Sequence, residues 1–203
     1  MPLLTPWLGW EGVWVWAMAP PSSPPPLPPG HSVEEADPSC AERVAREVDR
    51  PPSALRRQMA LARLFLLRRE GVAVCFGWAS VGTPAPVGEV GGTFVPQSGE
   101  AYIWDCYTLR PFRGRGYFRL LLRWMTSRLG KEGIGQVWIA NREGNLPARR
   151  ATARAGFRPM ARIRYRVVGP LRRWWVEPLP GSPPEGVQEV RARFRPGDPL
   201  ARF

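Results

Sequence analysis

The sequence is poor in the residues from which many catalytic and metal sites are built. Its 203 residues include a single histidine, His31, and three cysteines at positions 40, 75 and 106, with no C-x-x-C pair. One histidine cannot form a metal cluster, and it excludes a conventional Ser-His-Asp or Cys-His site unless His31 itself is the base. An odd number of widely spaced cysteines favours free thiols in a reducing compartment over a disulfide framework or a zinc site. We therefore expect a cytoplasmic protein without a metal centre.

Long apolar runs and lysine are also scarce. No run reaches the roughly eighteen apolar residues that a membrane span requires. The first eighteen residues are apolar, but they lack a basic start and contain Glu11, so a signal peptide is not expected. Lysine occurs once, arginine occurs 28 times, and the net charge is +12, which favours anionic partners. Because the arginines are spread over nearly every segment, a general arginine preference explains them too, and nucleic acid is a possible but not a favoured partner.

Length and proline content divide the chain into three parts. A hydrophobic fraction of 44% over 203 residues allows one sizeable core, and the 25 prolines gather near both ends. We predict a Trp/Pro-rich extension and linker at 1–29, a folded domain at 30–168 and a basic, Pro-rich extension at 169–203. Residues 12–18 are expected to form an extra edge strand that covers the sheet or the site entrance, or else a poorly ordered leader. The last segment is expected to lie on the core or to be partly disordered.

Hydrophobic periodicity and turn residues predict the elements of the folded domain. The expected order is β-α-α-β-β-β-α-β-α-β, an α/β sandwich with helices on a mixed sheet. Ser53 is expected to cap the second helix, and Gly130 to end the third. The predicted strands are 31–36, 63–69, 72–81, 101–108, 136–140 and 157–168, and the predicted helices are 37–49, 54–62, 117–129 and the segment that follows Asn145. Residues 89–95 are a candidate for a further short strand that this order does not count.

A strand, a glycine-bearing turn and a helix meet just before the third helix. The first N–H groups of a helix have no partner within it, and the peptide dipoles place partial positive charge there. Gly114 and Gly116 let a ligand approach the backbone, and Arg113, Arg115 and Arg119 add full charges. The segment therefore predicts a cradle for a phosphate or pyrophosphate. A tight turn with solvated arginines explains the G-x-G spacing equally well, and the chain has no P-loop sequence.

Two blocks of the sequence resemble the acyl-CoA-binding segments of the GNAT acetyltransferase superfamily. Residues 113–118 (RGRGYF) resemble its R/Q-x-x-G-x-G/A signature, with Phe118 where Gly or Ala is usual. The second block follows the N-x-x-[AS]-x-x-x-Y-x-x-x-G-F spacing, with threonine in the tyrosine position, through Asn145, Ala148, Thr152, Gly156 and Phe157. The resemblance covers about residues 30–168. It implies a mixed central sheet that is flanked by helices and splayed between the strands at 101–109 and 136–140.

The resemblance also implies where acetyl-CoA binds as the acyl donor. Backbone groups of Tyr107, Thr108 and Leu109 would bond the pantetheine in the gap of the sheet. Asn145 would contact the pantetheine arm, cap its own helix, or do both. The expected reaction is direct attack of an amine on the thioester, with a backbone N–H near Tyr107 or Leu109 stabilising the oxyanion. The pyrophosphate would bind at the helix start formed by Arg113, Gly114, Arg115, Gly116, Tyr117 and Phe118.

Asp105 is the leading candidate for the base that removes the proton of the amine. It is the only acid inside its aromatic strand, where an unpaired carboxylate is costly to bury. It also matches the aspartate of the E-D-x-x-V pattern of polyamine-type GNAT enzymes, with Trp104 in place of that pattern's glutamate. An ion pair with a nearby arginine explains Asp105 equally well, and Glu100 is the reserve base. Because threonine is a poor proton donor, Tyr107, Cys106 or water would protonate the leaving thiolate.

These features together predict an N-acetyltransferase that moves an acetyl group from acetyl-CoA to an amine acceptor whose identity the sequence leaves open. The alternative is a non-catalytic, arginine-rich module on the same fold that binds RNA or an acidic partner. The threonine at position 152, Phe118 and the net charge of +12 keep that alternative open. The oligomeric state is open as well.

Overall fold

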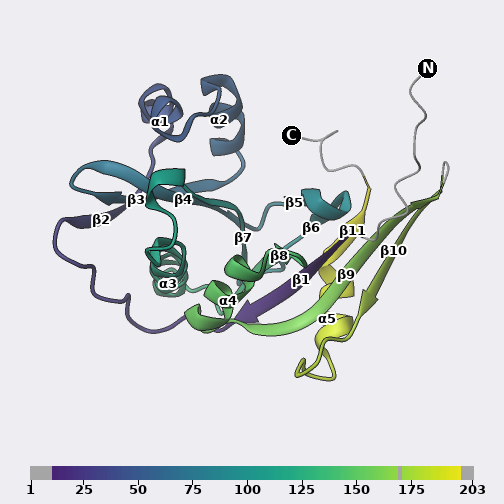
Figure 1. Cartoon of the computed structure of the whole chain (residues 1–203). Coiled ribbons are helices and arrows are strands. Elements are labelled where there is room, and N and C mark those ends of the chain that lie inside the picture. The colour runs from purple at the N-terminus through teal and green to yellow at the C-terminus, as the bar shows by residue number, and fades with distance from the viewer. Residues whose placement is uncertain (1–10, 169–170, 198–203) are drawn as a thin grey trace, which may run out of the picture.

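A large mixed sheet forms the centre of the computed structural model, which describes residues 11–168 and 171–197. Its eight strands have the order β10-β9-β1-β8-β7-β4-β3-β2 (Figure 1). They are β1 (Glu11–Met18), β2 (His31–Glu35), β3 (Arg63–Arg69), β4 (Val72–Val81), β7 (Glu100–Thr108), β8 (Gln136–Arg142), β9 (Arg158–Val168) and β10 (Leu171–Glu177). A smaller sheet has the order β11-β6-β5 and consists of β5 (Ala85–Val87), β6 (Gly92–Phe94) and β11 (Phe194–Pro196).

The α-helices cover both faces of the large sheet. The helices α1 (Ala41–Val48), α2 (Pro52–Met59) and α5 (Gly186–Arg193) share one apolar cluster with the small sheet. The helices α3 (Tyr117–Lys131) and α4 (Leu146–Ala155) bury their apolar sides in a second cluster, on the opposite face (Figure 1). This arrangement confirms the predicted α/β sandwich. Within residues 11–168 and 171–197, every helix is too short or too polar to reach across a lipid bilayer.

The strand β1 lies inside the large sheet, so the expectation of an edge strand is wrong. It pairs antiparallel with β8 on one side and with β9 on the other. Val13 and Val15 are fully buried in the cluster that contains α1 and α2. Trp14 and Trp16 face the α3–α4 side, where the Arg149 guanidinium carbon lies 3.4 Å from the Trp14 ring centroid. The alternation of side chains between the two faces is a property of any strand. The pairing of β1 with β8 and β9, in contrast, is decided only by the tertiary fold.

The strands β7 and β8 run parallel and separate partway along their length. Their pairing ends at Ile103↔Ile139, although both strands continue beyond these residues. This divergence confirms the predicted splayed sheet. Because paired strands satisfy one another's backbone groups, two diverging edges present N–H and C=O groups to whatever lies between them.

Two helix ends differ from the predicted caps. The helix α2 begins at Pro52, so Ser53 lies inside its first turn and does not cap it. Proline suits the first position of a helix, because the N–H that it lacks would have no partner there. The helix α3 continues past Gly130, and Gly133, with φ of 89°, follows its last turn in a left-handed conformation. A Cβ on Gly130 would lie 2.6 Å from the Cβ of Pro20. Glycine at 130 therefore admits the proline-rich segment and does not end the helix.

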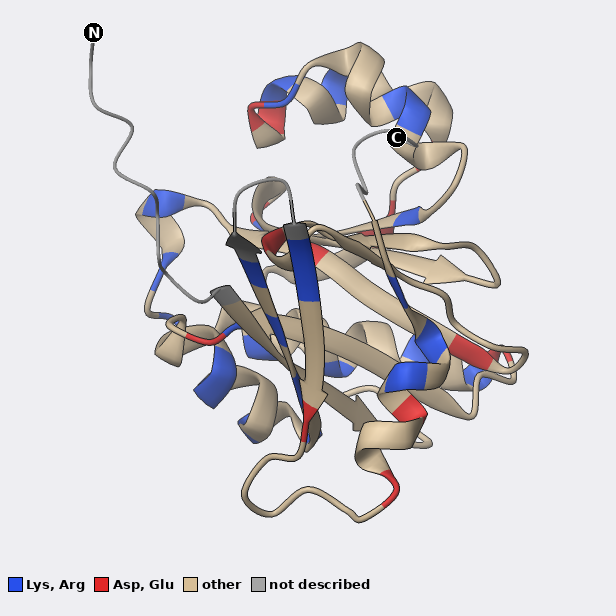
Figure 2. Cartoon of the chain, turned by 90° about the vertical axis from the view of Figure 1, so that its right-hand side faces the viewer, with Lys and Arg blue, Asp and Glu red and all other residues tan. Residues whose placement is uncertain are grey.

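The C-terminal segment belongs to the fold. The strand β10 pairs with β9 at one edge of the large sheet, and β11 pairs with β6 of the small sheet. Directly paired residues of antiparallel strands share a face, so Arg164 lies beside Trp175 and Arg166 beside Arg173. Figure 2 shows the basic segments on these two neighbouring strands. The sheets therefore take strands from both predicted extensions.

Candidate active site

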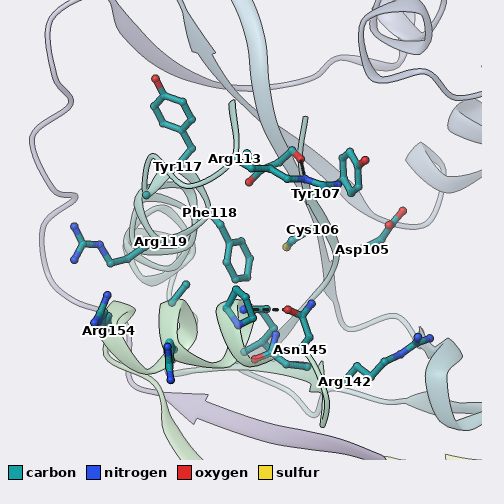
Figure 3. A pocket seen from close by; sticks show the side chains of 18 of the residues that line it. Asp105, Cys106, Tyr107, Arg113, Tyr117, Phe118, Arg119, Arg142, Asn145 and Arg154 are labelled. Atoms are coloured by element: carbon teal, nitrogen blue, oxygen red, sulfur yellow. Dashed lines mark hydrogen bonds between the residues drawn. The ribbon is translucent and has the colours of Figure 1, made fainter. Parts of the chain in front are cut away.

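A cavity of about 1110 Å³ opens where β7 and β8 diverge (Figure 3). Its walls come from these two strands, from the turn before α3, from the first turn of α3, from one side of α4 and from Glu89. Leu109, Arg115 and Glu100 are not among the residues that line it. The other residues predicted for the site are all brought together there: Asp105, Tyr107, Thr108, Arg113, Gly114, Gly116, Tyr117, Phe118 and Asn145.

The first turn of α3 meets the cavity without a capping side chain. Its N-cap residue, Gly116, has φ of 79° and ψ of 5°, and no side chain of residues 11–168 or 171–197 bonds the first N–H groups of the helix. Gly114 has φ of 78°. A Cβ on either glycine would meet nothing within 4 Å, so the left-handed backbone, and not crowding within the protein, requires glycine here. An anion placed at this point would meet free N–H groups and the positive end of the helix dipole.

Five arginines line the cavity. Neither α3 nor α4 contains an acidic residue, and the arginines of the cavity wall form no ion pair within the described part of the chain. Arg142, at the end of β8, lies on the Asp105 side of the cavity, whereas Arg119 and Arg154 line it from α3 and α4, on the opposite side (Figure 3). This end of the cavity therefore suits a ligand with several phosphate groups. The five arginines of the wall are Arg113, Arg119, Arg142, Arg150 and Arg154.

The N–H group of β7 that points into the gap is that of Thr108 and not that of Leu109. The Leu109 N–H donates to the Val74 carbonyl at 3.0 Å, so the expectation that Leu109 bonds a ligand is wrong for this group. Since successive residues of a strand turn their backbone groups to opposite sides, the Thr108 N–H points away from β4 and toward the gap. The Thr108 carbonyl accepts a bond from Arg113 Nε at 3.1 Å. The Arg113 guanidinium carbon also lies 4.9 Å from the Tyr107 ring centroid, which fixes this arginine over the strand.

Asn145 and Phe118 face each other across the cavity. The Asn145 Oδ1 accepts the N–H of Ala148 at 3.2 Å and so caps α4, while the residue also lines the cavity. Phe118 is half-buried, and in Figure 3 its ring projects from α3 toward Asn145. The ring occupies space that the usual Gly or Ala would leave open, so it narrows the cavity between the two helices.

Asp105 lies in a β-bulge of β7. The register with β4 slips so that Asp105 and Cys106 together stand opposite Gly77. A Cβ on Gly77 would lie 2.7 Å from the Cys106 Sγ, so glycine makes room for the bulge. Asp105 has φ of 40°, a conformation that costs a residue with a side chain about 1–3 kcal/mol. Bulges re-aim side chains beside functional sites, and this one brings the Asp105 carboxylate to the cavity wall.

Arg50 pairs with this carboxylate. Its Nη2 lies 3.2 Å from Oδ1 and 3.4 Å from Oδ2 of Asp105, so the expected ion pair with an arginine is present. Burial against the cavity wall raises the pKa of Asp105, the Arg50 guanidinium opposes this shift, and the charge of Glu89 adds to it. A carboxyl group whose pKa is raised is better matched to accepting the proton of an ammonium group.

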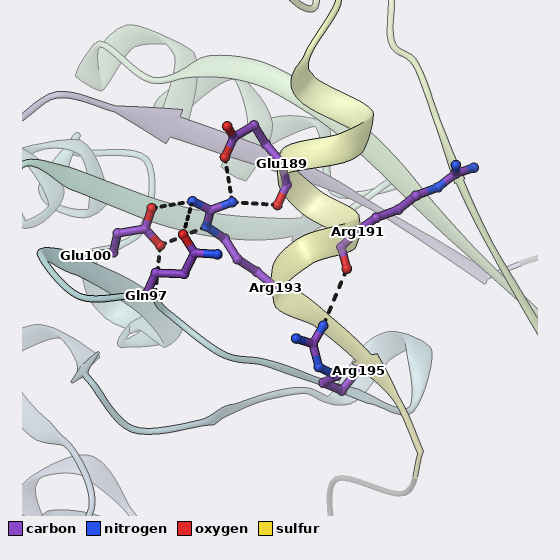
Figure 4. A network of polar contacts seen from close by, with 6 residues as sticks. All are labelled: Gln97, Glu100, Glu189, Arg191, Arg193 and Arg195. Atoms are coloured by element: carbon purple, nitrogen blue, oxygen red, sulfur yellow. Dashed lines mark hydrogen bonds and ion pairs between the residues drawn. The ribbon is translucent and has the colours of Figure 1, made fainter.

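Glu100 lies apart from the cavity. It is buried at the start of β7, where Arg193 donates to it from Nε at 2.7 Å and from Nη2 at 2.5 Å (Figure 4). The Gln97 N–H donates to the same carboxylate at 2.9 Å. Burial alone would raise the pKa of Glu100, but the Arg193 guanidinium outweighs it and the pKa lies below its usual range. The expectation of a reserve base is therefore wrong, because this carboxylate is committed to anchoring α5.

Two other candidates for proton transfer differ in position. Thr152 is fully buried and does not line the cavity, so it has no access to a leaving group there. Cys106 lines the cavity, and burial raises the pKa of its thiol well above the usual range. A neutral thiol is a weak nucleophile. The predicted proton donors Cys106 and Tyr107 both line the cavity from β7.

Sequence reasoning missed Glu89 and Asn141. Glu89, in the short 3₁₀ helix Gly88–Val90, lines the cavity beside the bulge strand, and no local pattern marks it. Asn141 is 7% exposed and lines the cavity from β8. Its Oδ1 has no hydrogen-bond partner among the described residues, and leaving such an atom buried costs about 1–3 kcal/mol. The sequence did contain a signal for Asn141. It follows Val137 and Ile139 at two-residue spacing, so it lies on the same buried face of the strand, where a polar side chain is unusual.

Comparisons with known proteins agree with this geometry. Residues 37–157 match the model of the Acetyltransferase (GNAT) family. A putative GNAT acetyltransferase from Novosphingobium aromaticivorans DSM 12444 is similar in structure, with a TM-score of 0.56 and 16% identity over 77% of this chain and 63% of that one. A GCN5-related N-acetyltransferase from Sphaerobacter thermophilus has a TM-score of 0.53 and 22% identity, covering 83% of this chain and 52% of that one. No curated protein matches the chain in sequence.

A third solved structure, a GCN5-related N-acetyltransferase from Kribbella flavida, has a TM-score of 0.53 and 18% identity over 83% of this chain. The chain spans 63%, 52% and 58% of the lengths of these three relatives. Identities this low establish the fold alone. The family match covers more than half of the chain and contains the gap in the sheet, the start of α3 and the α4 block. The chain belongs to the GNAT family of acetyltransferases.

Proposed function

We propose that the protein transfers an acetyl group from acetyl-CoA to an amine, and that the amine attacks the thioester directly. The observation that carries this proposal is the uncapped start of α3, which opens on a cavity lined by five arginines. CoA carries a pyrophosphate and a sugar phosphate, and these several negative charges match the several positive charges of the arginines in the wall. Three free cysteines among the described residues support a reducing compartment such as the cytoplasm.

The residues of the cavity fit the other parts of this donor. The Gly116 turn and the first N–H groups of α3 would hold the pyrophosphate, with the arginines of α3 and α4 around it. The Thr108 N–H and the unpartnered Asn141 Oδ1 would bond the amide groups of the pantetheine. Asn145 would keep its role as cap while its side chain bounds the same space. These assignments use donors and acceptors that the protein itself leaves free or exposed to the cavity.

The chain's own residues supply the proton transfers and the orientation. Acetyl-CoA supplies an activated acetyl group, and the cavity would hold it next to the acceptor. Asp105 would take the proton of the acceptor ammonium, and a backbone N–H directed into the gap would stabilise negative charge on the thioester oxygen. Cys106 or Tyr107 would return a proton to the departing sulfur, because Thr152 lies outside the cavity.

Thermal stability and thiol release test this proposal together. We expect acetyl-CoA to raise the melting temperature of the wild type, because binding to the native state alone stabilises it. The double variant Arg150→Gln/Arg154→Gln should lose most of that shift. Arg123→Gln is the matched control, since Arg123 is exposed on α3 and does not line the cavity. Release of free CoA thiol should require an amine.

The competing function has its own signature. An RNA-binding module would show nucleic-acid binding with a steep salt dependence and no stabilisation by acetyl-CoA. That pair of results would overturn the proposed acetyl transfer. Stabilisation by acetyl-CoA with amine-dependent thiol release would exclude the non-catalytic module.

A further inference from the structure

The acidic residues of the chain, unlike its arginines, are distributed unevenly along the sequence. Residues 106–131 and 144–176 contain 16 arginines and lysines and no acidic residue. The rest of the chain contains the other 13 basic residues and all 17 acidic ones, so it is negatively charged on its own. The net charge of +12 therefore comes from these two segments. A general preference for arginine does not explain this distribution, because it would not exclude acids from two particular segments.

The fold brings the two acid-free segments to one face of the large sheet. They contain α3, α4, β9 and most of β10, and α3 and α4 pack on the same face. Trp14 points to that face, and Arg162 stands directly opposite it on β9, so Arg162 points there as well. Arg166 follows on the same side of β9, and Arg173 pairs with it from β10 (Figure 2). The surface that we call the basic face comprises Arg119, Arg123, Arg150, Arg154, Arg166 and Arg173.

The acidic residues beside this face neutralise little of it. Glu143 and Glu177 both pair with Arg162, at 3.0 and 2.7 Å. Five arginines of the basic face are exposed, and none of the five forms an ion pair within the part of the chain that the structure describes. They are Arg119, Arg123, Arg150, Arg154 and Arg173. A face with this much unpaired charge of one sign attracts an anionic partner.

Coenzyme A accounts for only part of this charge. Arg119, Arg150 and Arg154 line the cavity proposed for it. Arg123 and Arg173 are not among the residues of the cavity wall. The strand β10 lies three strand spacings from β8, about 14 Å, so a donor held between β7 and β8 leaves the β9–β10 part of the face open. The partner of the whole face is therefore a longer polyanion.

Nucleic acid is the polyanion that the basic face fits best. The planar guanidinium of arginine binds two phosphate oxygens at once, and a nucleic-acid strand presents phosphates at regular intervals over any length. Trp175, half-buried beside Arg164, adds an aromatic ring of the kind on which bases stack. A lipid surface would need apolar side chains to insert. Of the exposed large hydrophobic side chains in the described residues, only Leu146 belongs to α3, α4, β9 or β10.

We propose that the basic face binds the phosphate backbone of a nucleic acid, as a second activity beside the proposed acetyl transfer. Arg123 and Arg173 contact phosphates outside the cavity. Arg119 and Arg154 lie where the basic face meets the cavity. The sequence contained the signal for this surface in its missing acids, but only the fold places the two acid-free segments on one face.

Fluorescence anisotropy with a labelled twenty-nucleotide oligouridylate, and with a DNA duplex of the same length, measures this binding. We expect the affinity for the RNA to fall about 100-fold between about 50 and 200 mM salt, which is the value for five phosphate contacts on a single strand. Binding of either nucleic acid with such a salt dependence supports the proposal, and the tighter of the two identifies the preferred form. Absence of binding to both at the lower salt concentration, or an affinity that salt does not change, would overturn it.

A pair of double variants with the same change in charge separates the basic face from the net charge. Arg123→Gln/Arg173→Gln should weaken RNA binding at least tenfold and reduce the slope of log affinity against log salt by about 1.4, while the acetyl-CoA shift in melting temperature persists. Arg46→Gln/Arg57→Gln is the matched control, because both arginines are exposed on α1 and α2, on the other side of the sheet. It should change the RNA affinity less than twofold. Equal losses in the two double variants would contradict the proposal.

Other polyanions complete the test. A twenty-residue polyglutamate and phosphatidylserine vesicles stand for an acidic protein and an anionic membrane, and an affinity for either that equals or exceeds that for RNA would overturn the proposal. The outcome is also separable from that of the proposed function. Failure of acetyl-CoA to raise the melting temperature would count against acetyl transfer and leave the RNA result standing, whereas loss of RNA binding alone would overturn only this inference.

Discussion

Replacing Arg193 by methionine should strongly destabilise the fold, although this residue lies outside the segment that matches the family model. Its guanidinium donates to Glu100, to the side chain and carbonyl of Glu189 and to Gln97 (Figure 4). It also lies 4.7 Å from the Trp138 ring centroid. Methionine keeps the apolar stem of arginine and removes its charge and all of its donors.

The expected magnitude follows from the burial of the pair. The side chains of Arg193 and Glu100 are 6% and 9% exposed, and removing one member of a buried pair costs about 3–5 kcal/mol because the other charge stays buried alone. The bond to Glu189, whose side chain is 39% exposed, adds less than about 1 kcal/mol. We therefore expect Arg193→Met to lower the free energy of unfolding by about 4 kcal/mol.

Urea denaturation at neutral pH measures this loss. Combining Arg193→Met with Glu100→Gln should cost less than the sum of the two single changes, because neither charge is then left alone. Glu100→Gln should also retain its kcat/KM at a temperature where it is folded, since Glu100 lies outside the cavity. A loss below about 1 kcal/mol for Arg193→Met would show that the pair is not the buried anchor described here.

The pH dependence gives an independent check of the same pair. The pKa of Glu100 is lowered in the folded state, whereas an unfolded glutamate has a pKa of about 4.3. The stability that this shift contributes is therefore fully present above that value and is lost as pH falls through the folded pKa. The difference between the wild type and Arg193→Met should shrink over this acidic range, and a difference independent of pH would contradict the assignment.

Three further predictions concern the site and the sheet. Asp105→Asn should lower kcat/KM about 10²- to 10⁴-fold and remove an acidic limb that lies above the ordinary aspartate pKa, because the pKa of Asp105 is raised; an unchanged pH profile of kcat/KM would refute its role as base. Asn141→Leu should raise the KM for acetyl-CoA about tenfold through the loss of one hydrogen bond while the melting temperature holds or rises; an unchanged KM would remove the pantetheine contact. Deleting residues 1–18 should abolish cooperative unfolding, since β1 pairs on both sides; a wild-type melt by circular dichroism would show that β1 is dispensable.

The parts of the site that lie close together in sequence were predictable. The apolar spacing of α3, the glycines before it and the cap at Asn145 are local features, because each depends on contacts within about one helical turn. The structure confirms the helix and the cap, and it places both glycines in the left-handed region. The splayed sheet was predicted from the family resemblance, since no local pattern specifies where two parallel strands separate.

The sequence by itself determined most elements between residues 31 and 168, the glycine-bearing turn before α3 and the excess of arginine, since backbone preferences and composition are properties of short segments. Tertiary structure decided which charges meet. Arg50 and Asp105 are 55 residues apart, and Glu100 and Arg193 are 93 apart. Such pairs, like the place of β1 between β8 and β9, depend on how distant segments pack. The free energy of a carboxylate depends on the burial and counter-charge that this packing creates, so only the folded chain distinguishes the cavity residue Asp105 from the anchor Glu100.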